Sequence, residues 1–167
     1  MIQVYTGNGK GKTTAALGLA IRAAGAGRKV YIGQFIKGLE YCELKSLKKF
    51  KNIKVEQFGR GCFIKGKPAQ KDIDLACAGL KKVWAIAGNK KFTLIILDEI
   101  NVALDLKLLE CREVLRLIKN FPKKTELVLT GRNAPQEIIK IADLVSEIRE
   151  VKHYYRQGQT ARRGIEY

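Results

Sequence analysis

Residues 5–14 (YTGNGKGKTT) place a glycine-rich turn between an apolar strand and an amphipathic helix. This order constrains the fold strongly, because it is the sequence form of a loop that wraps a polyphosphate. Glycines let successive backbone N–H groups turn toward an anion, and the N-terminus of the following helix adds partial positive charge. We therefore expect the nucleotide-binding residues to be Gly7, Asn8, Gly9, Lys10, Gly11, Lys12, Thr13 and Thr14.

Two side chains of this loop suit a triphosphate and its metal ion. Lys12 can place an ammonium group beside the phosphates, which makes it a candidate catalytic residue, and the Thr13 hydroxyl can bind a magnesium ion. The spacing departs from the strict phosphate-loop pattern, because the first glycine would fall at Thr6 and counting from Gly7 leaves the loop one residue short. A dinucleotide-binding fingerprint fits less well, since its third glycine would fall on Lys12. A glycine-rich turn without a ligand is the remaining alternative.

Length and charge limit the possible classes of protein. A chain of 167 residues predicts one domain, residues 1–167, which buries about two thirds of its unfolded surface. The 32 Lys+Arg against 16 Asp+Glu give a formal net charge of +16, which favours anionic partners such as nucleotides, nucleic acid or an acidic protein. The lysine-rich stretches contain few aromatic residues that could stack on bases. We therefore expect a solvated basic surface and no nucleic-acid partner.

The cysteines and the apolar runs indicate the cellular compartment. The four cysteines are far apart and include no Cys-x-x-Cys pair, which indicates neither a zinc site nor a disulfide framework and suits a reducing cytosol. The chain begins at the first expected strand, so we expect no signal peptide, and no apolar run is long enough to span a bilayer. We expect a cytoplasmic protein that does not enter a membrane.

Apolar runs alternate with helix-period segments along the chain, which is typical of repeated βα units around a parallel sheet. We expect an α/β fold of the P-loop NTPase, RecA-like kind: a mostly parallel six-stranded sheet with helices on both faces. Irregular segments at 59–69 and 155–167 should lie near the ligand end of the sheet. Strands are expected at 2–6, 30–36, 53–58, 93–98, 125–130 and 144–151, and helices at 13–26, 40–50, 70–87, 109–120 and 135–141.

An apolar run at 94–97 ends in Asp98 and Glu99, which is the form of the acidic strand end that accompanies a phosphate loop. Asp98 can hold a metal ion directly or through water, and Glu99 can position water or join the metal shell. The candidate metal ligands are therefore Thr13, Asp98 and Glu99, and Glu99 joins Lys12 as a candidate catalytic residue. A carboxylate pair at the end of a strand can also cap a helix, but the loop favours the metal interpretation.

Residues 130–135 (TGRNAP) close the fifth expected strand at the same edge of the sheet. Arg132 could bind phosphate or a carboxylate there, and we count it among the nucleotide-binding candidates. The same residues also fit a turn followed by a helix N-cap and a proline in the first turn. His153 is the only histidine and is assigned no role, so acyl-transfer chemistry of the Ser-His-Asp kind lacks support.

Taken in order, these motifs resemble those of the P-loop corrinoid adenosyltransferases, the ATP:cob(I)alamin enzymes. The resemblance includes the shortened spacing of the loop and runs from one end of the chain to the other. Its last three blocks make it specific, because the loop alone indicates only an NTPase. The matching blocks are residues 7–16, 97–99, 129–132, 142–147, 151–153 and 164–167.

The resemblance implies transfer of the 5′-deoxyadenosyl group of ATP to the cobalt of a reduced corrinoid, cob(I)alamin or a precursor, with release of triphosphate. It implies ATP and the corrinoid as substrates, with Mg²⁺ or Mn²⁺ as the metal ion. It also implies that the triphosphate lies reversed in the loop, with the 5′-carbon open to attack. A homodimer is the family expectation, and the basic surface could dock an acidic flavoprotein or another electron donor.

Two departures from the family pattern affect the site. Other members carry an N-terminal extension that can cover the active site, whereas this chain starts at the first strand, so we expect closure from elsewhere. Many members have a Gly-x-Gly-Phe-Thr-Trp-like stretch whose aromatics approach the corrin, but residues 59–64 (GRGCFI) contain no tryptophan. Phe63 is the candidate corrin-facing aromatic, with Cys62 and Ile64 as neighbours, although a loop phenylalanine can also anchor a local core.

Two other function classes remain open from the sequence. One is a RecA-like ATPase that hydrolyses ATP to ADP and is stimulated by nucleic acid, which the net charge and Glu99 beside Asp98 would suit. The other is a nucleotide-binding partner protein without enzymatic activity, which the complete loop disfavours. The products distinguish the enzymes, because transfer releases triphosphate whereas hydrolysis releases ADP and phosphate.

Overall fold

The computed structural model describes residues 1–61, 64 and 66–167. These residues form one six-stranded sheet in the order β3-β2-β4-β5-β1-β6. Every neighbouring pair of strands is parallel, so all six carboxyl ends meet at one edge. The strands are β1 (Ile2–Thr6), β2 (Val30–Lys37), β3 (Ile53–Gly61), β4 (Leu94–Asp98), β5 (Glu126–Thr130) and β6 (Leu144–Glu147).

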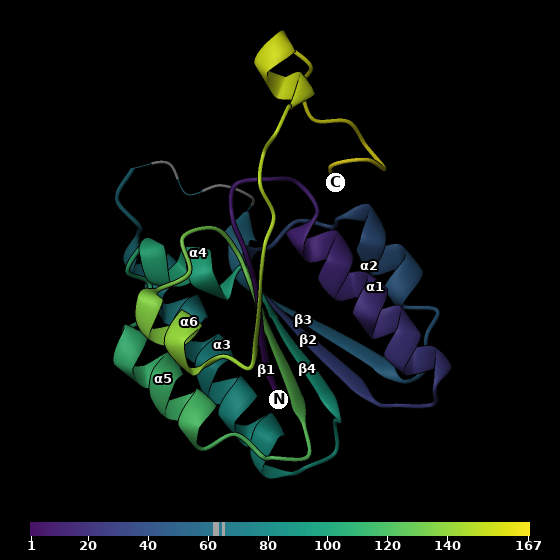
Figure 1. Cartoon of the computed structure of the whole chain (residues 1–167), viewed down its shortest axis with the longest axis vertical. Helices are drawn as coiled ribbons and strands as arrows, with labels where there is room; N and C mark the ends of the chain where they lie inside the picture. The colour runs from purple at the N-terminus through teal and green to yellow at the C-terminus, as the bar shows by residue number, and fades with distance from the viewer. Residues whose placement is uncertain (62–63, 65) are drawn as a thin grey trace.

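Helices cover both faces of the sheet (Figure 1). Helices α1 and α2 lie on one side, and α3 to α6 lie on the other. This arrangement confirms the expected P-loop, RecA-like α/β fold. The helices are α1 (Lys12–Gly25), α2 (Cys42–Leu47), α3 (Gln70–Gly88), α4 (Ile100–Asp105), α5 (Cys111–Lys119) and α6 (Gln136–Ile141), and a short 3-10 helix, η1 (Tyr154–Gln157), follows near the C-terminus.

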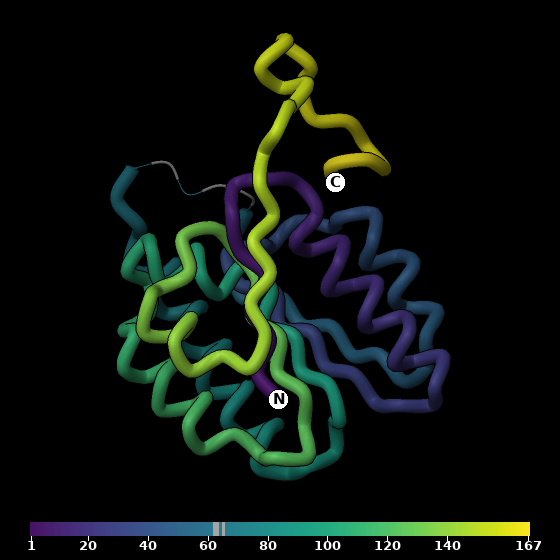
Figure 2. The backbone as a smooth tube through the Cα atoms, in the orientation of Figure 1, coloured from purple at the N-terminus to yellow at the C-terminus, as the bar shows by residue number. Residues whose placement is uncertain are grey.

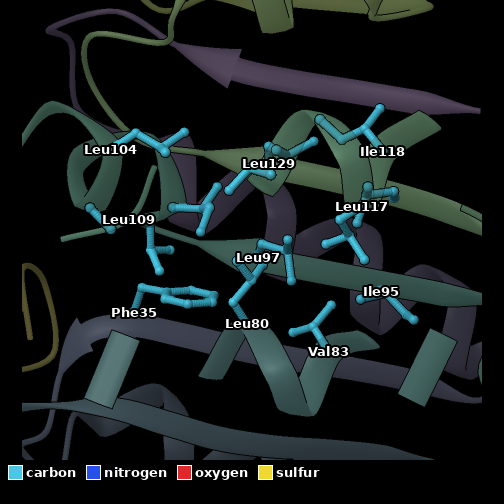
Figure 3. Close-up of a cluster of buried hydrophobic side chains, with 14 of the residues drawn as sticks. Phe35, Leu80, Val83, Ile95, Leu97, Leu104, Leu109, Leu117, Ile118 and Leu129 are labelled. Carbon is cyan, nitrogen blue, oxygen red and sulfur yellow. The ribbon is translucent and has the colours of Figure 1, made fainter. Parts of the chain in front are cut away.

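Successive residues of the central strands face opposite helix layers. Ile95 and Leu97 of β4 pack with side chains such as Val83 of α3 (Figure 3). Ile96, which lies between them, packs with Ala20 and other residues of α1 on the opposite face. Because both faces are covered, the strand is a continuous apolar run rather than an alternating one. The sheet therefore has two cores, one under each helix layer.

The face of α1 that packs on the sheet consists of small residues. Ala16, Ala20, Ala23 and Ala24 form the face of α1 that is turned toward the sheet. Alanine has a high helix propensity and lets the helix backbone approach the strands closely. This contact brings the N-terminus of α1 close to the carboxyl edge of the sheet, where ligands of open α/β sheets bind.

The end of β6 differs from the expected strand 144–151. The strand ends at Glu147 because its neighbour β1 ends at Thr6, which is paired with Glu147. One more backbone hydrogen bond, from Ile148 N to Thr6 O, closes the ladder at 2.8 Å. Beyond that point the chain has no strand to pair with, and the apolar residues that suggested a longer strand continue as a tail.

Three further elements differ from those expected from the sequence. Helix α4 was not expected, because its six residues are too few to show a period and follow the acidic strand end directly. Strand β3 continues to Gly61 instead of ending at residue 58. Helix α2 covers only Cys42–Leu47 of the expected 40–50.

The described residues bear on two expectations, one about the cysteines and one about membrane-spanning helices. Cys42, Cys77 and Cys111 are free cysteines, and Cys62 lies outside the described residues. In the described part of the chain, no helix combines the length and the apolar character needed to cross a membrane.

Packing between α3 and β3 gives a test of the fold. A Cβ atom added at Gly79 would lie 2.6 Å from Phe58 Cγ, whereas one at Gly18 of α1 would meet no atom within 4 Å. We expect Gly79→Ala to destabilise the protein by about 1–3 kcal/mol through overpacking, and Gly18→Ala to stabilise it by about 1 kcal/mol through helix propensity. Urea unfolding measures both changes. Equal shifts of the two variants would contradict this account of the interface.

Candidate nucleotide-binding site

The loop between β1 and α1 has the backbone shape of a phosphate loop. Gly7 has φ +94° and Gly11 has φ +120°, values in the left-handed region that favours glycine. Gly11 is the N-cap residue of α1, and its carbonyl accepts the first helical hydrogen bond from Ala15 N at 2.8 Å. The first N–H groups of α1 have no partner within the helix and are therefore available to an anion at this end.

The chain that follows β6 packs directly against this loop (Figure 2). Gly9 N donates to Ile148 O at 2.7 Å, so this amide holds the loop in shape and is not directed at an anion. A Cβ atom would lie 2.5 Å from Ile148 O if added at Gly7 and 2.7 Å from Arg149 O if added at Gly9. Both positions therefore require glycine for close packing of the backbone.

Lys12 curves back over the loop that precedes it. Its Nζ donates to Gly7 O and to Gly9 O, each at 2.7 Å, and the residue is buried. Burial lowers the pKa of Lys12, the charge of Arg132 lowers it further, and Glu99 partly offsets both. Since an ammonium group has three donors, Lys12 can hold the loop and still donate to a phosphate.

Asp98 is the centre of the polar network at the end of the sheet. Its side chain is only 1% exposed. Its Oδ1 accepts from Thr13 Oγ1 and Thr130 Oγ1, each at 2.8 Å. Its Oδ2 accepts from Lys37 Nζ at 2.8 Å and from Gln34 Nε2 at 3.2 Å. The loop, β2 and β5 therefore all meet at one buried carboxylate.

The alternation of the strands explains why these groups meet. Gln34, Asp98 and Thr130 each lie two residues beyond a side chain of the α1-side core, namely Ile32, Ile96 and Val128. Residues two apart in a strand share a face. All three polar side chains therefore turn toward α1, where Thr13 begins the helix.

Glu99 lies at the bend between β4 and α4. Its φ of +61° is unusual for a side chain of this size, and its N donates to Thr130 Oγ1 at 3.0 Å. Burial raises the pKa of Glu99, the nearby Asp98 raises it further, and Lys37, Lys12 and Arg132 partly offset the rise. The carboxyl therefore interacts with charges from the loop, from β2 and from the turn after β5.

The remaining nucleotide-binding candidates lie around the opening of the loop. Asn8, Thr14 and Arg132 are exposed. Arg132 follows Gly131, whose φ of +130° turns the chain at the end of β5, and its charge affects the pKa of both Lys12 and Glu99. The structure therefore brings Arg132 to the same edge as the loop and the acidic strand end.

The residues near the loop fit a magnesium ion better than a softer metal. Thr13 Oγ1 and the carboxylates of Asp98 and Glu99 are hard oxygen donors, which Mg²⁺ prefers. Within the described ranges, no cluster of three or more His, Cys, Asp or Glu side chains could hold a metal by itself. A metal bound here would therefore take part of its coordination from phosphate oxygens and water, as Mg²⁺ commonly does.

Lys10 joins the loop to the C-terminal tail. Its Nζ donates to Tyr154 Oη and Ile165 O, each at 2.9 Å, and to Glu166 Oε1 at 2.6 Å. Arg162 stacks over the Tyr154 ring at 4.8 Å, and the Tyr154 hydroxyl also donates to Glu166. The hydrogen bonds from Lys10 and Tyr154 hold the pKa of Glu166 well below its usual range.

Of the corrinoid candidates, Ile64 alone belongs to the residues that the structure describes. Cys62 and Phe63 lie outside the described residues, while Ile64 is half-buried and packs against the larger core. Arg60 forms a two-point ion pair with Asp72, through Nε at 2.8 Å and Nη2 at 2.7 Å. Together with Ile64, these groups line an open pocket of about 300 Å³.

The sequence analysis missed several residues that this geometry brings to the site. Gln34 and Lys37 are polar residues at the end of an apolar strand, which was an available signal. Thr130 follows an apolar run in the same way. Tyr154 gave no local signal, and Glu166 belonged only to a block of the family resemblance, because the folded tail alone places them beside Lys10.

Removal of the Lys10 side chain tests whether the tail is held by the loop. Lys10→Ala removes three hydrogen bonds to the tail, and a segment with few buried contacts opens more readily once its anchors are lost. We expect trypsin to cleave after Arg162 or Arg163 several-fold faster than in the wild type, as followed by mass spectrometry. Lys140→Ala, an exposed residue of α6, is the control. Unchanged cleavage in Lys10→Ala would show that the tail is held by other contacts.

Comparison with solved structures supports the fold. The chain is similar to the crystal structure of a KaiC-like protein from the hyperthermophilic archaeon Pyrococcus horikoshii OT3, with a TM-score of 0.56. The match covers 87% of this chain and 71% of that chain at 17% identity. At this identity the likeness concerns the fold alone, and it agrees with the RecA-like arrangement of the sheet.

Bacterial corrinoid adenosyltransferases are similar over the full chain. The protein from Sinorhizobium sp. is 34% identical over 171 residues, covering 100% of this chain and 80% of the relative. The protein from Escherichia coli (strain K12) is also 34% identical over 171 residues and is covered to 85%. The protein from Pseudomonas aeruginosa is 36% identical over 169 residues and is covered to 83%.

A family model confirms what these relatives indicate. The model described as ATP:corrinoid adenosyltransferase BtuR/CobO/CobP matches residues 1–167, the whole of the chain. The match includes the loop, the acidic strand end and the tail that contacts the loop. By the family model and by its relatives, the chain belongs to the ATP:corrinoid adenosyltransferase family.

Proposed function

We propose that this chain, acting as a single domain, transfers the 5′-deoxyadenosyl group of ATP to the cobalt of a reduced corrinoid and releases triphosphate. The observation that carries this proposal at the residue level is the hydrogen bond between Thr13 and Asp98, at 2.8 Å. It joins the phosphate loop to the acidic strand end in a family whose named members are corrinoid adenosyltransferases. The corrinoid is cob(I)alamin or a precursor of it.

The reaction requires little covalent chemistry from the protein. The electron pair of cobalt(I) forms the new bond to C5′ of ATP, and the C5′–O bond breaks with its electrons going to the triphosphate. The protein must hold the two reactants in line and stabilise the charge that develops on the leaving group. This requirement fits a site that is rich in cations and has no paired nucleophile and base among the residues brought together at Asp98.

Lys12 and the N-terminus of α1 are the groups that stabilise the triphosphate in this proposal. The Lys12 ammonium is already fixed at the mouth of the loop by two carbonyl contacts. A fixed cation needs little reorganisation as negative charge develops. Arg132, exposed at the same edge, would bind a phosphate oxygen, and Gly7, Asn8, Gly9, Lys10, Gly11 and Thr14 would shape or contact the bound nucleotide.

Mg²⁺ or Mn²⁺ would be held at Thr13, with Asp98 and Glu99 beside it. When bound, the metal ion neutralises part of the triphosphate charge. Thr13 Oγ1 is oriented for this role by its hydrogen bond to Asp98. Glu99, with its raised pKa, would orient a water of the metal shell.

The corrinoid would approach from the side of Ile64, where the Arg60–Asp72 pair supports the start of the loop that follows β3. The other candidates for contact with the corrin, Cys62 and Phe63, come directly after β3 in the sequence. An apolar contact there would disfavour water beside cobalt. The comparisons favour this reaction over the ATPase alternative, since the named full-length relatives are adenosyltransferases.

The basic surface supports a proposal about the partners of the enzyme. With a formal net charge of +16, the chain would attract an acidic flavoprotein that reduces the cobalt, and charge complementarity raises the association rate. We also propose that the protein is a cytoplasmic homodimer, as expected from the sequence.

The salt dependence of the reaction tests the docking of the flavoprotein. The rate at which the flavoprotein reduces the cobalt should fall as the salt concentration rises. A rate that does not depend on salt would argue against electrostatic docking.

A product assay tests the proposed reaction. We expect wild-type protein with ATP, Mg²⁺ and reduced cobalamin to yield triphosphate and the visible spectrum of the Co–C product, and little ADP. Lys12→Ala should lower kcat/KM by about 100-fold or more, because it removes a fixed charge at the leaving group. Lys140→Ala, an exposed lysine of α6, should keep the wild-type rate. ADP and phosphate as the main products would support the ATPase instead.

A further inference from the structure

The pairing of β2 with β3 becomes irregular just before β2 ends. The register runs from Val30 opposite Ile53 to Phe35 opposite Phe58, and then shifts so that Lys37 is opposite Gly61. Two residues along β2 therefore correspond to three along β3, so the register of the pair shifts at this point. Ile36, at the shift, has φ +67°, and a β-branched residue rarely adopts such a value.

The irregularity changes the face of the sheet to which the last side chains of β2 point. Phe35 and Ile36 are consecutive residues, yet both belong to the core on the α3–α6 side. The alternation of the strand is therefore shifted by one residue. Lys37 then falls on the same face as Gln34, and both donate to Oδ2 of Asp98. In a regular strand, residues 34 and 37 would point to opposite faces.

Two glycines allow the strands to approach each other at this point. A Cβ atom at Gly59 would lie 2.0 Å from Ile36 O, and one at Gly38 would lie 2.2 Å from Gly59 O. Neither contact is possible for a side chain. Strained backbone of this kind persists only where the surrounding structure holds it, and it is often found at functional sites. The strain at Ile36 turns Lys37 toward Asp98.

Lys37 is enclosed by groups that keep it charged and in place. Its side chain is 13% exposed, and its Nζ lies 2.8 Å from Asp98 Oδ2 and 3.9 Å from Glu43 Oε1. It also lies 5.2 Å from the centre of the Tyr41 ring. Burial would lower the pKa of Lys37, but Asp98, Glu99 and Glu43 outweigh burial and raise it.

The donors around Asp98 use its whole capacity as an acceptor. Oδ1 receives Thr13 and Thr130, and Oδ2 receives Gln34 and Lys37. A carboxylate offers about four lone-pair sites, so these four bonds leave none for a metal ion. Asp98 can then act on a metal only through the Thr13 hydroxyl that it orients.

We propose that Lys37 is a positioning residue that holds Oδ2 of Asp98, so that this carboxylate orients Thr13 and does not bind the metal ion itself. The divalent cation then enters the site with the nucleotide, held by the triphosphate and Thr13. It does not bind to the protein alone. This inference rests on the proposed function in one respect, because it requires that the substrate is a nucleotide with a bound metal ion.

Binding of Mn²⁺ alone tests the role of Lys37. Lys37→Gln removes the ammonium donor from Oδ2 of Asp98, which keeps only the bond from Gln34, and takes away one positive charge beside the carboxylate. We expect this variant to bind Mn²⁺ without nucleotide at least about tenfold more tightly than the wild type at pH 8, as measured by the electron paramagnetic resonance signal of free Mn²⁺. Lys37→Arg, which keeps the charge, should behave as the wild type. Lys45→Gln removes a charge from an exposed position of the neighbouring α2 and should also leave Mn²⁺ binding unchanged.

Equal Mn²⁺ affinity in Lys37→Gln and the wild type would overturn the proposal, as would an equal gain in Lys45→Gln. A second measurement needs no variant and serves if Lys37→Gln does not fold. Wild-type protein should bind Mn²⁺ tightly only when ATP is present, and tight binding of Mn²⁺ alone would overturn the proposal. Neither measurement contains a corrinoid. A failure of adenosyl transfer would therefore count against the proposed function and leave this inference standing.

Discussion

The buried carboxylate of Asp98 is the interaction on which the site depends. It receives hydrogen bonds from the start of α1, from the end of β2 and from the end of β5. A charge that is 1% exposed is tolerated only when it is paired and hydrogen-bonded. The strand order and the docking of α1 must therefore both be correct before this carboxylate is satisfied. The same arrangement places Thr13, Lys12 and Glu99 around one point at the carboxyl edge of the sheet.

The phosphate loop is held from outside as well as from within. Lys12 binds two carbonyls of its own loop, while Ile148 accepts a hydrogen bond from Gly9. Lys10 adds contacts to Tyr154 and the last residues of the chain. Because the Lys10 contacts come from residues 144 to 156 positions further along the chain, the shape of the loop depends on the complete fold. A loop held in this way needs little reorganisation to stabilise negative charge, as the proposed release of triphosphate requires.

Prediction from sequence succeeded where the signal is local. The strand–loop–helix order at residues 2–26, the apolar strand ending in Asp98 and the βα alternation are all properties of neighbouring residues, and the structure reproduces them. It failed at elements whose limits are set elsewhere. Strand β6 ends at Glu147 because β1 offers no further partner, and α4 is too short to show a period. The prediction that Phe63 faces the corrin, with Cys62 as a neighbour, stays a prediction, because both residues lie outside the described part of the chain.

The sequence by itself determined the kind of site: a polyphosphate loop with a lysine and a threonine, an acidic strand end and an α/β sheet around them. Such features depend on backbone preferences and periodicity, which a short stretch of residues encodes. The tertiary structure alone decided which side chains complete the site. Lys37 reaches Asp98 only because strand pairing is irregular at Ile36, and because glycines just after β2 and within β3 permit the close approach. The contact between Lys37 and Asp98 depends on the register of strands across the sheet, so it cannot be predicted from any single segment of the chain.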